Sequence, residues 1–305
     1  MVKYITKRVL TGILTLYILV TITFFLVRLM PGNPFAGENI TQSTMDALKK
    51  AYNLDAPLLV QYQTYLLNLL HGDMGISFKK PGVTVNNLIA GALPATMSVG
   101  IIAFVFSFVF GTIVGIWQAS VKNNAIKGIL LSVVTFGISM PNFIVALLLL
   151  MLFGIVLGLL PVVGLMRPAS YILPVLSLSF YPIATTAKLV NSTYTEAMNQ
   201  DFVTLARAKG LKPPIIAFRH ILRNAMIPVI TYMGPTIAFL LTGSFVVENI
   251  FTIPGLGMEF VKSISNRDYT VILGLTVFMG AVVIAANLMV DIICCIVDPR
   301  IKLSD

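Results

Sequence analysis

Long apolar runs separated by polar segments dominate the chain. A helix that crosses the hydrocarbon core of a bilayer needs about 20 consecutive, mostly apolar residues. The runs lack the alternation of apolar and polar positions that is typical of β-barrels. They predict six membrane-spanning helices, at about 9–29, 96–118, 129–153, 171–189, 228–247 and 271–293. Pro141 and Pro182 are expected to kink the third and the fourth helix.

Composition supports a membrane protein. Hydrophobic residues make up 57% of the 305 residues and charged residues only 11%, whereas an average soluble protein is about 25% charged. So few charges could not cover the surface of a soluble fold, which excludes a soluble enzyme, a disordered protein and a nucleic-acid binder. The adjacent Cys294 and Cys295 exclude a disulfide framework and a cysteine-based zinc site. The predicted fold class is an all-α polytopic membrane protein.

Lysine and arginine residues in the loops predict the orientation, because cytoplasmic loops carry an excess of them. With the N-terminus in the cytoplasm, 13 of the 21 basic residues fall on the inner side. The inner segments then carry a net charge of +8 and the outer segments a net charge of +1, out of +9 for the chain. Six spans place both termini in the cytoplasm.

The spans lack the groups that power a transporter or catalyse a reaction. No Asp, Glu, Lys or Arg falls in the middle of any predicted span, which counts against an ion-coupled transporter but not against a facilitator. The chain has no G-x-x-x-x-G-K-[ST] loop for ATP and no H-E-x-x-H motif. Its two histidines, His71 and His220, lie on opposite sides of the membrane in this topology. We therefore expect no catalytic, cofactor-binding or metal-binding residue and no enzymatic activity.

The outer segment 31–92 is longer than a connection needs to be. A turn is expected at 31–34, a helix at 44–52 and a second helix at 58–70. The second helix is too short and too polar to span, so it is expected to lie at the outer membrane surface. Two interpretations remain open, a lid that packs on the helix ends and a docking surface for an extracytoplasmic partner.

The inner segment 190–227 is the most informative part of the chain. A short helix is expected from Asp201 to Lys209, with Asp201 as its N-cap and Gly210 ending it in a left-handed conformation. The two prolines after Lys212 forbid its continuation. A second helical stretch, 215–225, is expected to run into the fifth span.

Small residues on the short helix, Ala206, Ala208 and Gly210, would let another surface approach it closely. Two hypotheses follow from the residues alone. Either the helix is a basic interfacial element held by anionic lipid headgroups, or it is a knob that fits into a groove of a partner protein.

Two runs in this segment, Gln200–Leu211 and Arg219–Pro228, resemble the cytoplasmic coupling loop, or "EAA" loop, of ABC-importer permeases. The likeness is to the branch of oligopeptide, dipeptide and nickel permeases, above all to the first of the two oligopeptide permease subunits. The glutamate of the general consensus falls on Thr204, a departure typical of the branch. Similar motifs recur along the chain, at Arg28–Pro34, Tyr52–Pro57, Leu93–Thr96, Phe136–Phe143, Val246–Phe251, Pro254–Gly257, Asn266–Tyr269 and Asp298–Ile301.

The resemblance implies a type I ABC-importer permease fold in a bacterial cell membrane. Its five-helix core would be residues 93–293 and include the loop 190–227, after an N-terminal helix (1–30) and the outer segment (31–92), and before a cytoplasmic tail (294–305). A second permease would complete the pathway for oligopeptides. Two cytoplasmic ATPases, which use ATP and Mg²⁺, would each grip one coupling helix, and an external binding protein would deliver the peptide. The chain itself would bind no cofactor.

The same resemblance assigns roles within the inner segment. The ATPase-coupling helix would comprise Asp201, Phe202, Thr204, Leu205, Ala206, Arg207, Ala208, Lys209, Gly210 and Leu211, and the residues that support the loop would be Arg219, His220, Arg223 and Asn224. A dipeptide or nickel permease is the alternative within the family. A stand-alone channel or facilitator is the alternative from another class.

Overall fold

The computed structural model describes residues 2–29 and 55–297 of the chain, and nearly all of them are helical or in turns. No strand occurs among these residues, only an isolated bridge between Ile76 and Thr84. The all-α prediction is therefore confirmed for the described part. The helices are α1 (Val2–Leu29), α3 (Leu58–Leu70), α4 (Val85–Ser120), α5 (Asn124–Ser139), α6 (Asn142–Leu149), α7 (Ile172–Met198), α8 (Asp201–Ala208), α9 (Pro213–Ile215), α10 (Arg223–Thr242), α11 (Phe245–Ile250), α12 (Leu256–Asn266) and α13 (Tyr269–Val297), with π-helical segments at Leu150–Val156 (η1) and Ile216–Leu222 (η3).

Within residues 2–29 and 55–297, five helical stretches are long and apolar enough to cross a membrane, and a sixth crossing exists if one bent pair is counted as a span. The five stretches are Ile5–Leu29, Val85–Ser120, Pro168–Met198, Pro213–Ile250 and Tyr269–Ile293. Each overlaps a predicted span. The fifth predicted span, 228–247, differs in detail, because α10 ends at Thr242 and α11 follows as a separate short helix.

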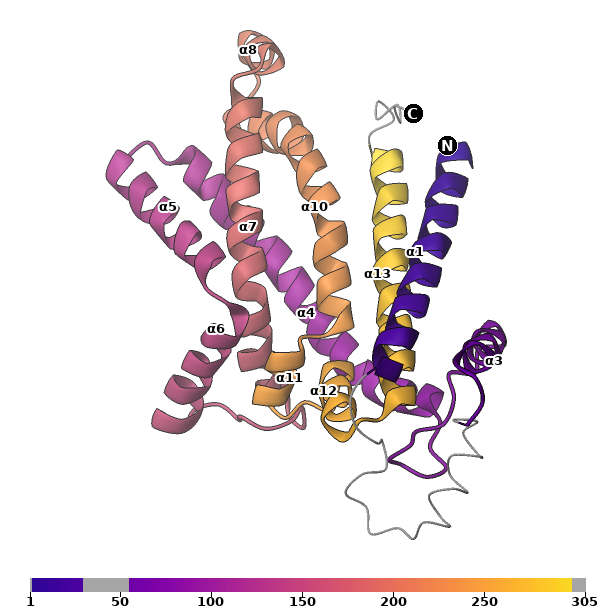
Figure 1. The fold of residues 1–305 in the computed structure, drawn as a ribbon. Coiled ribbons are helices and arrows are strands. Elements are labelled where there is room, and N and C mark those ends of the chain that lie inside the picture. Colours follow the sequence, from indigo (N-terminus) through magenta and orange to yellow (C-terminus); the bar gives the residue numbers. More distant parts are fainter. Residues whose placement is uncertain (1, 30–54, 298–305) are drawn as a thin grey trace.

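The predicted third span is broken rather than kinked. The helical stretches Asn124–Ser139 and Asn142–Val156 meet at an angle of 102°, so α5 and α6 form the V in Figure 1. Met140 and Pro141 are both extended, with ψ values of 121° and 137°. Proline disfavours helical backbone in the residue before it, which explains why the break begins at Met140. Pro182 acts differently, because α7 runs through it without interruption.

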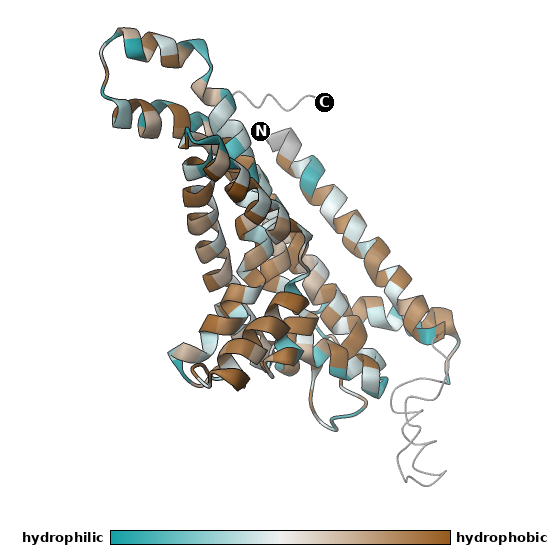
Figure 2. Ribbon diagram, turned by 90° about the vertical axis from the view of Figure 1, so that its left-hand side faces the viewer, coloured by the Kyte–Doolittle hydropathy of each residue, from teal (hydrophilic) through white to brown (hydrophobic). Residues whose placement is uncertain are grey.

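The two ends of the bundle differ. Figure 1 shows the start of α1, the end of α13 and the tip α8 at one end, and α3, α11 and α12 at the other. Figure 2 shows mostly hydrophobic residues along the long helices and a more hydrophilic tip at α8. This arrangement agrees with termini that share the side of the inner segment. The predicted turn at 31–34 and helix at 44–52 lie outside the described residues, whereas the helix at 58–70 is confirmed as α3.

Small residues bring the central helices together. Ala103, Ser107, Gly111 and Gly115 follow one another at four-residue intervals on the buried face of α4. A Cβ atom at Gly115 would lie 2.6 Å from the carbonyl oxygen of Ala187 on α7, so only glycine permits this approach. Small residues at such intervals are typical of helix pairs in membranes. In lipid the hydrophobic effect does not drive helices together, so close packing of their backbones stabilises the pair instead.

A buried carboxylate fixes the outer loop between α3 and α4. Asp268, which precedes α13, accepts hydrogen bonds from the hydroxyl of Ser77 and from the backbone N–H of Phe78 at 3.1 Å. Lys80 Nζ on the same loop pairs with Glu259 Oε2 on α12 at 2.7 Å. The loop is thereby tied to both α12 and α13.

The Lys80–Glu259 pair predicts a pH-dependent contribution to stability. Burial opposes the ionisation of Glu259, but the hydrogen bond and charge of Lys80, with the charge of Lys262, outweigh it and lower the pKa of this carboxyl. A lowered pKa in the folded state means that the contribution is present above the ordinary pKa of glutamate and is lost as the pH falls through the lowered value. We expect Lys80→Gln to reduce stability by less than about 1 kcal/mol, as for other pairs near the surface.

Thermal unfolding of the purified protein at several pH values checks this prediction. The parent and Lys80→Gln should differ at neutral pH and converge in acid, where Glu259 is protonated in both. Arg267→Gln removes an exposed charge from the same side and is the control. A difference that persists unchanged in acid would contradict the assignment.

Candidate coupling surface

The short helix of the inner segment exists as predicted, with one correction at its start. Helix α8 spans Asp201–Ala208, but its N-cap is Gln200, and no side-chain hydrogen bond caps it. Asp201 is instead the first helical residue. Its charge in the first turn and that of Arg207 in the last turn both complement the helix dipole. Sequence alone placed the cap one residue too late because aspartate is a favoured residue at both positions.

The end of α8 is fixed by Gly210. Its φ is +71°, in the left-handed region, as predicted. The N–H of Gly210 donates to the carbonyl of Arg207 at 2.9 Å, and the N–H of Leu211 donates to that of Ala206 at 3.3 Å. These two bonds form a Schellman motif, which satisfies carbonyls at the helix end and turns the chain sharply.

Gly210→Val is expected to disturb this turn without touching the membrane spans. No atom lies within 4 Å of a Cβ built at Gly210, so crowding is not the reason. The left-handed conformation itself costs a residue with a β-carbon about 1 kcal/mol or more. Gly210→Asn is the matched control, because asparagine adopts this conformation more readily. ATP-driven uptake should fall further for valine than for asparagine, and equal activity of the two variants would show that the turn is not critical.

One face of α8 is anchored to its own chain. Val203 and Ala206 are buried, at 0% and 3% exposure, in an apolar cluster. The cluster also contains residues from the end of α7, from η3 and from the start of α10, namely Tyr194, Ala197, Ile216, Ile221 and Ala225, with Ile116 and Ala119 of α4 packed against it. A force applied to α8 therefore passes through this cluster, and chiefly through η3, to three long helices.

The opposite face of α8 is exposed. Leu205 is 56% exposed although it is a large apolar residue, and Thr204, Arg207 and Ala208 are also exposed. Of the three small residues expected to let a partner approach, Ala206 is buried against its own chain, so the expectation is wrong for this residue. Ala208 and Gly210 are exposed, and their contact with a partner stays a prediction.

Two further exposed apolar residues lie just beyond α8, and sequence analysis did not single them out. Ile215 and Phe218 are 42% and 68% exposed on the segment that leads into α10. The sequence does carry a signal for them, because both are large apolar residues within a basic segment. With Leu205, they are the exposed large apolar residues of the described segment 201–225. The same segment exposes the basic residues Arg207, Lys209, Lys212, Arg219 and Arg223.

The four residues predicted to support the loop lie on η3 and α10. Arg219, Arg223 and Asn224 are exposed, and His220 is half-buried. The amide Nδ2 of Asn224 donates to the carbonyl of His220 at 2.8 Å, within the same helical stretch. Apolar packing by Ile216 and the other members of the cluster holds α8 in place, and the supporting role of the four polar residues stays a prediction.

At the end of the molecule opposite α8, Glu248 joins its own helix, α11, to α12 and α4. It is 4% exposed and accepts hydrogen bonds from Thr96 Oγ1 at 2.9 Å and from the backbone N–H of Met258 at 3.0 Å, with a further bond from Gly257. Thr96 Oγ1 in turn accepts the N–H of Leu256 at 2.8 Å. The first three amide groups of α12 are thus satisfied by side chains from α11 and α4. In the sequence, the runs that contain these residues, Leu93–Thr96, Val246–Phe251 and Pro254–Gly257, stand out only through the family resemblance.

Comparison with known proteins agrees with this architecture. The family described as "Binding-protein-dependent transport system inner membrane component" matches residues 111–303, and its N-terminal component matches residues 1–100. The chain belongs to this family.

The permease has full-length relatives. It is 42% identical to the oligopeptide transport system permease protein OppB of Haemophilus influenzae over 305 residues, which cover 99% of this chain and 100% of OppB. It is 40% identical to the dipeptide transport system permease protein DppB of Lactococcus lactis over 303 residues, which cover 99% and 100% of the two chains. The resemblance stated from the sequence is therefore confirmed.

A solved structure shares the fold of this permease. The inward-facing MetNI methionine ABC transporter aligns with a TM-score of 0.60 over 69% of this chain and 96% of that chain, at 18% identity. The type I permease fold is thereby confirmed.

Proposed function

We propose that this permease forms half of the pathway of an ATP-driven peptide importer and couples it to ATPase subunits through α8. The anchored and apolar-tipped α8 carries the proposal, because it offers a partner an exposed contact whose motion reaches α4, α7 and α10. The chain supplies no ATP site of its own, so ATP and Mg²⁺ belong to the ATPases. Oligopeptides are the proposed substrate, since the relatives include oligopeptide permeases.

The proposed assembly contains a second homologous permease, two cytoplasmic ATPases and an extracytoplasmic peptide-binding protein in a bacterial cell membrane. ATP-driven closure of the ATPase pair would displace α8 and switch the pathway from inward-open to outward-open. The pathway then has two conformations, and nucleotide binding shifts the equilibrium between them. Dipeptides are the second candidate substrate, because a dipeptide permease is similarly close in sequence. Both substrates require the same coupling.

Reconstitution tests the proposal. The chain is co-expressed with the second permease and the ATPases encoded beside its gene, and uptake of labelled dipeptides, tripeptides and pentapeptides into proteoliposomes is measured with the binding protein present. We expect uptake that needs ATP and all subunits, and co-purification of the ATPases. Peptide flux through this chain alone, without ATP, would instead support a facilitator, and uptake limited to dipeptides would favour the second candidate.

The orientation carries its own prediction. A reporter that is active only outside the cytoplasm should work when fused after Lys80 or Arg167. It should be silent after Lys122, Lys212 or the C-terminus. Activity at Lys212 would place α8 outside, where ATPases are absent, and would overturn the coupling assignment as well as the topology.

A further inference from the structure

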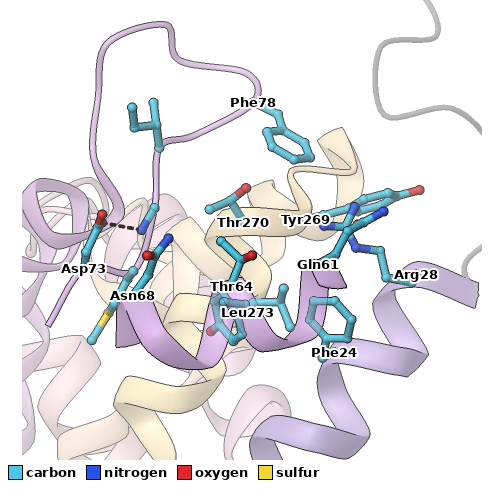
Figure 3. Close-up of a pocket in the computed structure, with 14 residues that line it drawn as sticks. Phe24, Arg28, Gln61, Thr64, Asn68, Asp73, Phe78, Tyr269, Thr270 and Leu273 are labelled. Atoms are coloured by element: carbon cyan, nitrogen blue, oxygen red, sulfur yellow. Dashed lines mark hydrogen bonds between the residues drawn. The ribbon is translucent and has the colours of Figure 1, made fainter. Parts of the chain in front are cut away.

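A cavity of about 310 Å³ lies at the outer end of the molecule, away from the coupling surface. It is enclosed by the end of α1, by α3, by the segment 73–78 and by the start of α13, as Figure 3 shows. Both aromatic and polar side chains line it. The lining includes Phe24, Arg28, Tyr65, Asn68, Asp73 and Tyr269.

Two residues that line this cavity each carry a donor atom without a hydrogen-bond partner among the described residues. These donors are Nε of Arg28 and the hydroxyl of Tyr65, and both atoms are buried. The guanidinium of Arg28 lies over the ring of Phe24, at 5.4 Å from its centroid, a contact that uses the face of the cation and leaves its in-plane N–H groups available. Burial raises the pKa of Tyr65, which keeps its hydroxyl protonated and able to donate.

The charges of the cavity are separated. Figure 3 shows Arg28 and Phe24 at one end and Asp73 and Asn68 at the other. Asp73 Oδ1 accepts the backbone N–H of Gly75 at 2.8 Å, which fixes the carboxylate at that end. A matching ligand would place an anionic oxygen at Arg28 and Tyr65 and a hydrogen-bond donor toward Asp73.

The surroundings place the cavity at the level of lipid headgroups. The sequence predicts that the first span ends at about Leu29, one residue after Arg28, because Pro31 and Gly32 follow. Next to the cavity, α3 exposes large apolar side chains, among them Leu59, Leu67 and Leu70 at 62%, 58% and 83% exposure. A short helix with such a face, beside the end of a membrane span, lies in the interface and contacts acyl chains.

We propose that this cavity binds the headgroup of a glycerophospholipid from the outer leaflet. The phosphodiester accepts hydrogen bonds from Arg28 and Tyr65, and a headgroup that donates hydrogen bonds, such as glycerol or ethanolamine, faces Asp73 and Asn68. The acyl chains run along the exposed leucines of α3. The bound lipid thereby fastens α3 and the loop 73–78 to α1 and α13.

Native mass spectrometry of the purified complex tests this site. Delipidated complex is titrated with phosphatidylglycerol, phosphatidylethanolamine and phosphatidylcholine, and retained lipids are counted. We expect one tightly held phosphatidylglycerol or phosphatidylethanolamine per chain, and weaker retention of phosphatidylcholine, whose headgroup donates no hydrogen bond. Arg28→Gln should weaken the tight site about tenfold or more, as expected for hydrogen bonds to a charged group.

Matched variants separate the site from general lipid contact. Tyr65→Phe should weaken retention severalfold, and Arg28→Lys should retain more lipid than Arg28→Gln. Arg267→Gln, which removes an exposed charge on the same side, should behave like the parent. Unchanged retention in Arg28→Gln, or equal loss in Arg267→Gln, would overturn the proposal. Displacement of the lipid by a tripeptide would show a peptide site instead. These measurements need no transport, so their outcome is independent of the proposed function.

Discussion

Leu205→Asp is expected to abolish ATP-driven peptide uptake while the chain still folds and inserts. Leu205 is an apolar residue of α8 that is more than half exposed, so the change removes little internal contact. Burying a leucine against a partner contributes about 1.5–3 kcal/mol, which is roughly a tenfold to 150-fold change in affinity. An aspartate at this position would additionally place an unpaired charge in the groove of the ATPase partner. ATPase co-purification and uptake are the measurements.

Three comparisons make this prediction specific to docking. Ala208→Trp adds bulk to the exposed face of α8 and should resemble Leu205→Asp. Ala206→Trp adds the same bulk to the buried face, where overpacking costs about 1–3 kcal/mol, so it should lower expression or thermal stability. The double variant Arg207→Gln and Lys209→Gln removes charge only and should keep most of its activity.

The alternative hypothesis, that α8 rests on anionic lipid, makes the reverse prediction. Each Lys or Arg near such a surface contributes about 1 kcal/mol, so the double glutamine variant would fail while Leu205→Asp and Ala208→Trp transported peptide. That pattern would remove the docking mechanism.

Local chemistry explains what the sequence could predict at α8. Its extent and its left-handed end at Gly210 follow from residues within a few positions, because capping is a local interaction. Which face is buried depends on Tyr194 and Ile216, which come from other elements. Hydrophobicity alone would have buried Leu205 before Ala206, and the structure shows the opposite. An exposed leucine beside a buried alanine is the arrangement expected of a face that contacts a partner.

The same reasoning applies to the helices. Six apolar stretches were visible because a bilayer demands long apolar runs, and the bounds of α3 matched because a proline and turn residues flank it. Pro141 signalled a break, but the 102° turn depends on how α6 packs against α7 and α11, which no local pattern encodes. Similarly, Glu248 is a charged residue near a span end in the sequence, where exposure to water would be expected. Its burial requires Thr96, more than 150 positions away.

Glu248→Ala is expected to cause the largest loss of stability among the outer substitutions. The change removes the acceptor for Thr96 and for the amide groups of Gly257 and Met258, and leaves these donors buried. A buried hydrogen-bond donor that is left without a partner costs about 1–3 kcal/mol. We therefore expect a cost in that range and release of the start of α12 from α4. Thermal unfolding followed by the fluorescence of Trp117 measures it.

Conservative changes show whether the carboxylate or only its volume is needed. Glu248→Gln keeps one acceptor oxygen and should lose less stability than Glu248→Ala. Gly255→Ala should be damaging without altering the carboxylate, because its Cβ would lie 2.5 Å from Glu248 Oε2 and from Thr96 Oγ1. Glu259→Gln, an acid on α12 whose partner is the half-exposed Lys80, should cost less than about 1 kcal/mol. If Glu248→Ala costs no more than Glu259→Gln, the amide groups of α12 find other partners. Glu248 would then not be what holds α12 to α4.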